Sequence, residues 1–317
     1  MIAQASLTFA AVQGWIFESL VQPAMFAVGL AAYMEDAYDG LEWFMLGVVE
    51  IVLLYILLRP LEAWRPVEVW PDRQATRVDM LYTLLNRLGI LPLLVFVALL
   101  PLEQAVDGWL RMHDIIPPNL EDLVPALSHQ PLLSFLVYLA IVDFAEYWRH
   151  RLQHRFDWWW ALHSLHHAQR QLSFWADNRN HLLDDLIGGA WISVVALVIG
   201  VPPGHFITIV IVTRMVESLS HANVRLSFGA LGERLLVSPR FHRLHHAIGA
   251  GHEGKFQGCN FAALFPVWDV LFGSADFSPA YQPTGVRDQL AGRDYGRGFV
   301  RQQVLGVRRL VETLRGA

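Results

Sequence analysis

The sequence predicts an all-α protein, an integral-membrane helical bundle with a cytoplasmic helical cap that carries a histidine-rich site for two metal ions. Three observations predict this fold. The 317-residue chain is 54% hydrophobic and only 17% charged, which is typical of a membrane protein. Apolar runs recur at roughly the 20-residue length that spans a bilayer. Eight of the 14 histidines gather in short clusters near the ends of these runs.

Five apolar runs are long enough to span or re-enter a membrane, and a weaker sixth run lies near residues 8–34. The five lie at about 41–59, 80–101, 131–148, 183–202 and 205–220. We therefore expect five or six membrane helices. The first run has neither a basic flank nor a small-residue cleavage site, so we expect no cleaved signal peptide.

Without internal repeats or long linkers, the chain divides only by composition. We expect an N-terminal transmembrane region over 1–130, a catalytic region over 131–275 and a C-terminal tail over 276–317, because Pro, Gly and charge enter near residue 275. The tail predicts an amphipathic helix over 298–315, lying on the membrane surface or on the body of the protein. Its apolar stripe comprises Val300, Val304, Val307, Val311 and Leu314.

Arginines in the connecting segments predict the orientation in the membrane, because basic loops stay on the cytoplasmic side. Segments 60–79 and 149–181 are rich in arginine, whereas 102–130 is mostly acidic. We expect a bacterial inner-membrane protein whose histidines face the cytoplasm. The single cysteine, Cys259, leaves no internal disulfide and no cysteine-based zinc site.

The eight clustered histidines form one HxxxH motif and two HxxHH motifs. On a helix, positions i, i+3 and i+4 share one face, so each motif presents its imidazoles in one direction. Solvated surface histidines are the alternative, but three such motifs in one chain favour a metal site. The clustered residues are His150, His154, His163, His166, His167, His242, His245 and His246.

Eight imidazoles exceed the needs of one metal ion, since a single site takes three or four ligands. Two metal ions are therefore predicted. His181 and His221 join the set because they stand at the ends of apolar runs facing the same layer. His113, His129 and His205 lie away from the clusters and are not predicted to bind metal, and for His252 the sequence favours neither interpretation.

Several carboxylates near the clusters are candidates to accept imidazole N–H groups, which would orient the metal ligands. Carboxylates at helix ends in lipid are costly unless they are paired. Plain interfacial charge is an equally good interpretation of each. The candidates are Asp143, Glu146, Asp184, Asp185 and Glu217.

The order of these motifs, followed by an Asn-aromatic step and "WDVLFG", resembles the fatty acid hydroxylase and sterol desaturase superfamily, a group of membrane di-iron oxygenases. The resemblance covers about residues 140–274. It implies that the eight clustered histidines and His221 are iron ligands. His181 is similar to a histidine that usually precedes Pro and Glu, both of which are missing here. Asn260-Phe261-Ala262 and Ser274 also depart from the pattern of many relatives.

The resemblance implies O2-dependent hydroxylation or desaturation of a lipid C–H bond at two iron ions (Fe2+/Fe3+), which zinc can replace during purification. Two electrons must come from outside, so we expect a separate ferredoxin or cytochrome to dock on the cytoplasmic face and no nucleic-acid partner. A possible landing patch comprises Arg149, Arg151, Arg155, Arg240 and Arg243, although positive-inside arginines occur on any membrane protein.

Two other functions compete with the oxygenase. A zinc hydrolase would use paired histidines, but no HExxH motif and no glutamate within a cluster supplies its general base. A metal-ion transporter would place histidines along its spans, whereas these collect at helix ends. The sequence does not distinguish a fatty acyl, sterol-like or aminolipid substrate. Trp158, Trp159, Trp160 and Trp175 match an interfacial aromatic belt better than the walls of a site.

Overall fold

Helices form the regular structure of the chain, as predicted. The computed structural model describes residues 2–316, and within them no β-strand forms beyond one isolated bridge between Ala247 and Thr284. The longer helices are α1 (Ile2–Ile16), α3 (Met34–Trp64), α4 (Arg73–Arg87), α5 (Ile90–Met112), α7 (Pro131–Arg155), α8 (Asp157–His167), α9 (Leu182–Ile199), α10 (Pro203–His221) and α14 (Phe299–Leu314). The shorter ones are α2 (Gln22–Ala27), α6 (Leu120–Leu123), α11 (Gly229–Leu235), α12 (Pro239–His245) and α13 (Val267–Leu271).

Four helical segments of the described chain are long and apolar enough to cross a membrane, fewer than the five or six expected. They are Ala31–Trp64, Ile90–Met112, Pro131–Arg155 and Leu182–Ile199. The weak run near 8–34 is divided among α1, a π-helical turn and α2. The run at 205–220 forms α10, which is helical but not among the four.

The run predicted at 80–101 is two helices rather than one. α4 ends at Arg87, and Gly89 adopts the left-handed conformation (φ 82°) before α5 begins. Glycine takes this conformation without the steric cost that other residues meet. The chain therefore turns in the middle of an apolar run, and only α5 is a candidate span.

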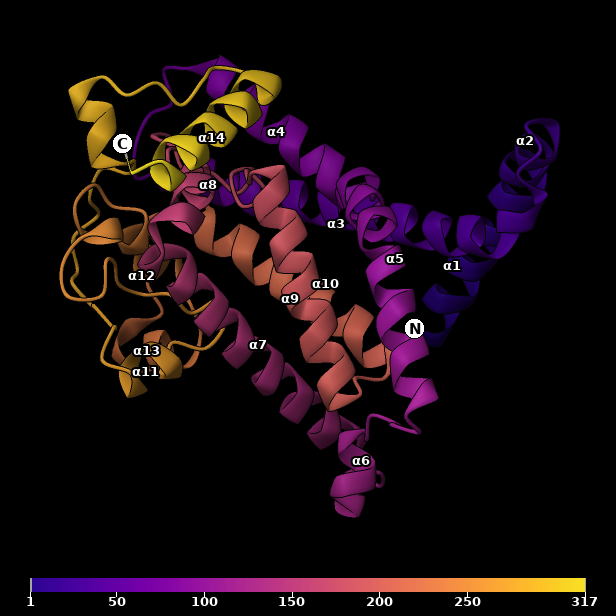
Figure 1. Cartoon of the computed structure of the whole chain (residues 1–317). Helices are drawn as coiled ribbons and strands as arrows, with labels where there is room; N and C mark the ends of the chain where they lie inside the picture. The colour runs from indigo at the N-terminus through magenta and orange to yellow at the C-terminus, as the bar shows by residue number, and fades with distance from the viewer. Residues whose placement is uncertain (1, 317) are drawn as a thin grey trace.

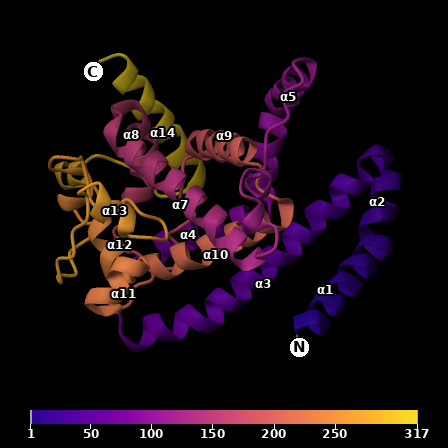
Figure 2. The ribbon, with the colours of Figure 1, turned by 90° about the horizontal axis from the view of Figure 1, so that it is seen from below.

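The helices diverge from the histidine-bearing end of the molecule (Figures 1 and 2). α7, α9 and α10 run beside one another, and α8 and α12 lie at one end of this group. The N-terminal arm of α1 and α2 lies on the side away from α12 and α13. Side chains at one end of three neighbouring helices can thus meet those of α8 and α12.

A buried arginine joins four parts of the chain below the histidines. The Arg87 guanidinium contacts Glu50 of α3 at 2.6 Å and Asp177 of the α8–α9 connection at 2.8 Å. It also donates to Ser218 Oγ of α10 at 2.9 Å. A Cβ on Gly47 would lie 1.8 Å from Arg87 O, so only glycine lets α3 approach the end of α4 this closely.

The predicted tail helix forms as α14, but it packs against the body through its polar face. Gln302, Gly306 and Arg309 are buried, and Arg309 Nε donates to Ala161 O of α8 at 3.0 Å. The apolar stripe points outward, with Val300 72% exposed and Val304 61% exposed. Polar contacts therefore fix α14 to α8, and the valines stay uncovered.

Candidate metal centre

Four helices carry the clustered histidines to one place. His150 and His154 lie on α7, His221 ends α10, and α8 carries all three histidines of the first HxxHH motif. α12 carries the second motif, with His246 as its C-cap. Ser238 caps the start of α12 by accepting the Phe241 N–H, and Pro239 follows at the first helical position. The local sequence therefore fixes where the second motif begins.

Nine histidines converge in two groups, and in each group the ligand atoms lie within 4.8 Å of one another. The first group comprises His150, His154, His163, His167 and His245, and the second comprises His166, His221, His242 and His246. Almost all are buried. The arrangement can hold two metal ions, one bound by five imidazoles and the other by four.

The two HxxHH motifs are divided between the groups in a reciprocal way. His163 and His167 of α8 enter the first group, and His166 enters the second. The second motif does the opposite, since His242 and His246 enter the second group while His245 enters the first. The sequence did not predict how the imidazoles of each motif are divided between two metal ions. Each motif bridges both groups.

Distances between ring nitrogens fit shared metal ions. His154 Nε2 lies 3.1 Å from His167 Nε2, and His221 Nε2 lies 3.2 Å and 3.1 Å from the Nε2 atoms of His166 and His242. Two nitrogens bound to one metal at about 2.1 Å are separated by roughly 3.0–3.4 Å. Six of the nine converging histidines also have a buried ring nitrogen without any hydrogen-bond partner, among them His150 Nε2, His163 Nε2 and His245 Nε2. The residues present therefore fit metal ions.

In most rings of the first group, a hydrogen bond at Nδ1 fixes the orientation of the imidazole. The Nδ1–H of His150 donates to Phe261 O at 2.8 Å, and that of His245 donates to Cys259 O at 2.7 Å. His154 Nδ1 donates to Gln257 O at 3.1 Å. A ring that donates through Nδ1 leaves the lone pair of Nε2 free to bind a metal.

The loop that supplies these carbonyls is built around Asn260. This residue has a left-handed backbone (φ 57°), which asparagine tolerates better than most residues. Its amide donates to Phe241 O and Asp276 O, and the Asp269 carboxylate accepts the N–H groups of Phe261 and Ala262. The Asn-aromatic step and "WDVLFG" thus shape the loop that orients histidines, a role that spacing alone could not reveal.

Of the five candidate carboxylates, only Asp184 accepts an imidazole N–H, from His163 Nδ1 at 3.0 Å. The structure corrects the expectation for the other four. Asp143 accepts the N–H groups of Leu264, Phe265 and Trp268, and Glu146 pairs with Arg149. Glu217 serves His221 only through its backbone carbonyl. Asp185 Oδ2 has no partner among the described residues.

The structure places His181 outside both groups. Its Nε2 contacts Gln303 O of α14 at 2.9 Å and its Nδ1 accepts the Leu183 N–H at 3.1 Å, so both ring nitrogens cap or brace helices. His252 stacks on Trp160 with ring centroids 3.5 Å apart. His113 and His129 are exposed, and His205 packs beside Phe135 and Tyr138.

The aromatic belt interpretation is wrong for most of the four tryptophans. Trp159 is buried and its Nε1 donates to Asp184 Oδ1 at 2.7 Å. Trp175 is buried against Phe174, and Trp160 lies against histidine rings. Only Trp158 is exposed. Trp159 therefore holds Asp184, and Trp160 covers histidine rings.

Most arginines of the predicted docking patch already have partners within the protein. Arg149 pairs with Glu146, Arg240 with Glu233 and Arg243 with Glu68. Arg151 donates to Tyr147 Oη and lies over aromatic rings, and Arg155 is exposed. Intramolecular partners therefore occupy most of these charges.

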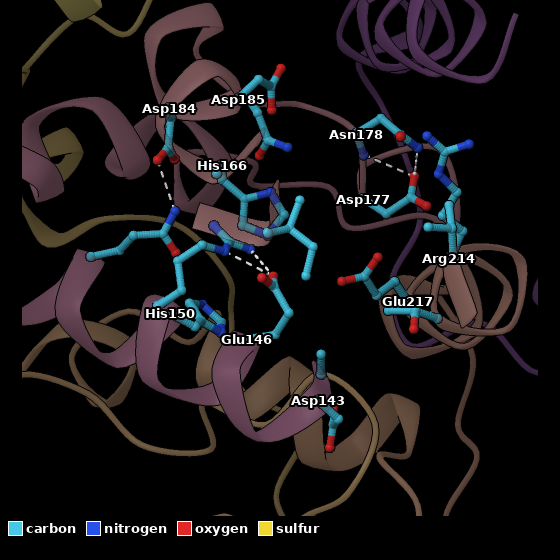
Figure 3. A pocket seen from close by; sticks show the side chains of 18 of the residues that line it. Asp143, Glu146, His150, His166, Asp177, Asn178, Asp184, Asp185, Arg214 and Glu217 are labelled. Carbon is cyan, nitrogen blue, oxygen red and sulfur yellow. Dashed lines mark hydrogen bonds and ion pairs between the residues drawn. The ribbon is translucent and has the colours of Figure 1, made fainter. Parts of the chain in front are cut away.

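A cavity of about 310 Å³ opens onto both histidine groups between α7, α9 and α10 (Figure 3). His150 and His163 of the first group and His166, His221 and His242 of the second line its inner end. A molecule inside it would lie beside the metal ions that the groups can hold.

Burial lowers the pKa of five histidines on α8, on α12 and at the C-cap of α12. It lowers the pKa of His245 to about 3, and burial together with neighbouring imidazoles holds the pKa of His166, His167, His242 and His246 well below 6.5. A neutral imidazole is the form that binds metals. The centre is therefore ready to bind metal at neutral pH.

The metal-free protein should lose stability as the pH falls below about 6.5. In that range the unfolded chain binds protons on these histidines and the folded chain does not. The free energy of unfolding therefore falls by up to about 1.4 kcal/mol per pH unit for each histidine. The loss should continue toward pH 3, the region of the lowered His245 pKa. Thermal unfolding of metal-free protein between pH 7.5 and pH 4 measures it. An unfolding midpoint that stays constant to pH 5 would contradict the prediction.

Replacing Asp184 with asparagine should weaken metal binding by about 10–100-fold, because the amide orients His163 less firmly than the carboxylate does. Asp184 also accepts hydrogen bonds from Gln153 Nε2 and Trp159 Nε1, so the substitution disturbs a buried hydrogen-bond network. Competition with a chelator measures the affinity. Asp122→Asn, at an exposed residue, is the control and should change nothing. Equal affinities for the Asp184→Asn variant and the unchanged protein would exclude an orienting role.

Comparison with known proteins agrees with this centre. Residues 135–274 match the fatty acid hydroxylase family. The ornithine lipid hydroxylase OlsE of Rhizobium tropici is 29% identical over 90% of this chain and 82% of its own length. Human alkylglycerol monooxygenase is 29% identical over 42% of this chain but only 28% of its own length. A rice very-long-chain aldehyde decarbonylase, GL1-10, is 27% identical over 57% of the chain and 58% of its own length.

No solved structure matches the chain. The matched region contains all nine converging histidines. This region carries the similarity of the chain to the fatty acid hydroxylase family.

Proposed function

We propose that the protein is a membrane lipid hydroxylase in which the two histidine groups hold two iron ions. The observation that carries the proposal is the convergence of nine imidazoles from four helices beside one cavity. The relatives that match are lipid hydroxylases and monooxygenases. The ligands would be His150, His154, His163, His167 and His245 for one ion and His166, His221, His242 and His246 for the other.

Bound iron would supply O2 activation and the abstraction of hydrogen from an unactivated C–H bond. The chain's own residues hold and shield that chemistry. Asp184 and the carbonyls of the 257–261 loop orient the ligands, and buried aromatic rings keep water away. The cavity between α7, α9 and α10 binds and directs the substrate.

The reaction balances as R–H plus O2, two electrons and two protons giving R–OH and water. A separate ferredoxin or cytochrome would deliver the electrons. The arginine-rich segments 60–79 and 149–181 support a bacterial inner-membrane location with the centre on the cytoplasmic side. OlsE aligns over most of both chains, which favours hydroxylation of a polar lipid over desaturation of a sterol-like ring.

Metal analysis and lipid mass spectrometry test the proposal together. Protein purified from iron-supplied cells should contain about two irons per chain, and cells that express it should contain a lipid 16 mass units heavier than its precursor. The heavier lipid should be absent without O2. One zinc per chain with O2-independent activity would overturn the proposal, as would an unchanged lipid profile.

A further inference from the structure

Aromatic rings other than those of the converging histidines contact only the first histidine group within residues 2–316. The Trp160 ring centroid lies 4.8 Å from that of His154, 5.1 Å from that of His167 and 6.2 Å from that of His163. Phe261 also contacts this group. Phe261 is fully buried, whereas Trp160 is partly exposed. The first group therefore reaches the protein surface through the Trp160 indole.

His252 extends this contact at the surface. Its ring stacks on the Trp160 indole with the centroids 3.5 Å apart and the two planes 2° apart, and it is partly exposed. His252 ends a short helical turn, Ala250–His252. A Cβ on Gly251 would lie 2.1 Å from His245 O, so only glycine lets this turn approach α12 so closely. The close approach holds His252 against the indole.

On the inner side of Trp160, ring contacts continue across both histidine groups. His167 of the first group stacks on His246 of the second, with the ring centroids 4.4 Å apart and the planes 19° apart. Trp160 contacts His167 directly. His252, Trp160, His167 and His246 therefore form a continuous row of rings that leads from the surface to both groups.

The outer part of this row of rings lies apart from the cavity proposed to hold the substrate. That cavity is lined by residues such as His150 and His166 (Figure 3). Neither Trp160 nor His252 lines it. The indole belongs to α8 and His252 to the loop after α12, whereas the cavity lies between α7, α9 and α10. An electron donor at the surface beside these two rings therefore leaves the substrate in place.

We propose that the Trp160–His252 pair is the entry point through which electrons from the separate donor protein reach the metal ions. The proposal rests on the proposed function, because it requires iron in the histidine groups. Each transfer oxidises the donor by one electron and reduces one ferric ion to the ferrous state, so two transfers reduce both ions. Electron transfer slows steeply as the gap between donor and acceptor widens. A partly exposed ring that contacts three ligands narrows that gap.

Anaerobic stopped-flow reduction of the oxidised, iron-loaded protein tests the proposal without turnover. One reductant is a reduced two-iron ferredoxin, a protein too large to enter a cavity of about 310 Å³. The other is dithionite, which is small enough to enter the cavity and approach both groups from inside. Absorbance follows the reduction of iron, and each rate constant is expressed per bound iron.

Substitutions at the two rings should affect only the protein reductant. Trp160→Leu should slow reduction by ferredoxin at least about 10-fold, equivalent to about 1.4 kcal/mol in the activation barrier, and leave the dithionite rate unchanged. Trp160→Phe keeps a ring beside the histidines and should retain most of the ferredoxin rate. His252→Leu should have a smaller effect, because the indole is itself partly exposed.

Trp158→Leu is the matched control. It removes an exposed indole from the same helix, one that contacts the rings of Phe156 and Trp159 and no histidine ring within residues 2–316. Both reduction rates should stay unchanged. An unchanged ferredoxin rate in the Trp160→Leu protein would overturn the proposal. Equal slowing with both reductants would also overturn it, because the substitution would then have altered the centre and not the entry point.

Failure of this proposal and failure of the proposed function are distinguishable. Ferredoxin reduction that depends on Trp160, in a protein that forms no heavier lipid, would keep the entry point and remove the lipid hydroxylase. An O2-dependent heavier lipid, together with a ferredoxin rate that is the same in the Trp160→Leu protein, would keep the hydroxylase and remove the entry point.

Discussion

Replacing His166 with alanine should reduce bound iron from about two ions to about one per chain and lower O2-dependent product formation by more than about 100-fold. His166 is one of only four imidazoles in the second group, and its Nε2 lies 3.2 Å from that of His221. Loss of a residue that merely orients a ligand typically costs 10–100-fold, so loss of the ligand itself should cost more. The five-histidine group keeps all its members.

Iron content and lipid product are measured on the same preparations of the His166→Ala protein. His129→Ala removes an exposed histidine outside both groups and should leave both quantities unchanged. Two irons per chain in the His166→Ala protein would show that His166 is not a ligand. A folded variant with no iron at all would show that the two groups bind metal only together.

Replacing Arg87 with methionine should destabilise the folded protein by about 3–5 kcal/mol, the range for removing one partner of a buried ion pair. The arginine side chain is fully buried, and its loss leaves the Glu50 and Asp177 carboxylates buried and unpaired. Methionine keeps most of the volume, so the effect comes from the charge. The unfolding midpoint should fall by at least about 6 °C.

Arg111→Met is the matched control, because Arg111 pairs with Asp107 at the surface, with 79% of its side chain exposed. Exposed pairs of this kind contribute about 0.5 kcal/mol or less. Thermal unfolding of the three proteins in one detergent gives the comparison. Similar midpoints for the Arg87→Met and Arg111→Met variants would mean that the buried network contributes no more than a surface pair.

The sequence was sufficient to predict an all-α membrane protein with a histidine-rich site, because long apolar runs and clustered imidazoles are local patterns. The sequence was insufficient where the backbone conformation determines the ends of the helices and the hydrogen bonds to the histidines. Gly89 divides an apolar run that reads as one span. The carbonyls that orient His150, His154 and His245 belong to residues 257–261 regardless of their side chains, so residue types could not reveal them.

Charged residues near the site misled the sequence interpretation for a related reason. A carboxylate can satisfy its hydrogen bonds with backbone N–H groups, tryptophan or arginine, and only the fold decides which of these it meets. Asp184 meets a histidine, whereas Asp143 meets the backbone of the 264–265 segment. His181 likewise stands at a helix start with its ring held by α14 instead of by its neighbours in the sequence.

The position of α14 bears on the order in which the protein matures. A Cβ on Gly306 would lie 2.2 Å from the His181 ring, and Arg309 donates to the carbonyl of Ala161, so the last helix of the chain closes tightly over α8 and the start of α9. Because synthesis runs from the N-terminus, residues 299–314 leave the ribosome after every histidine of the centre. Until then α8 lacks this cover, so the packing of α14 against α8 follows the synthesis of all the helices that carry the histidines.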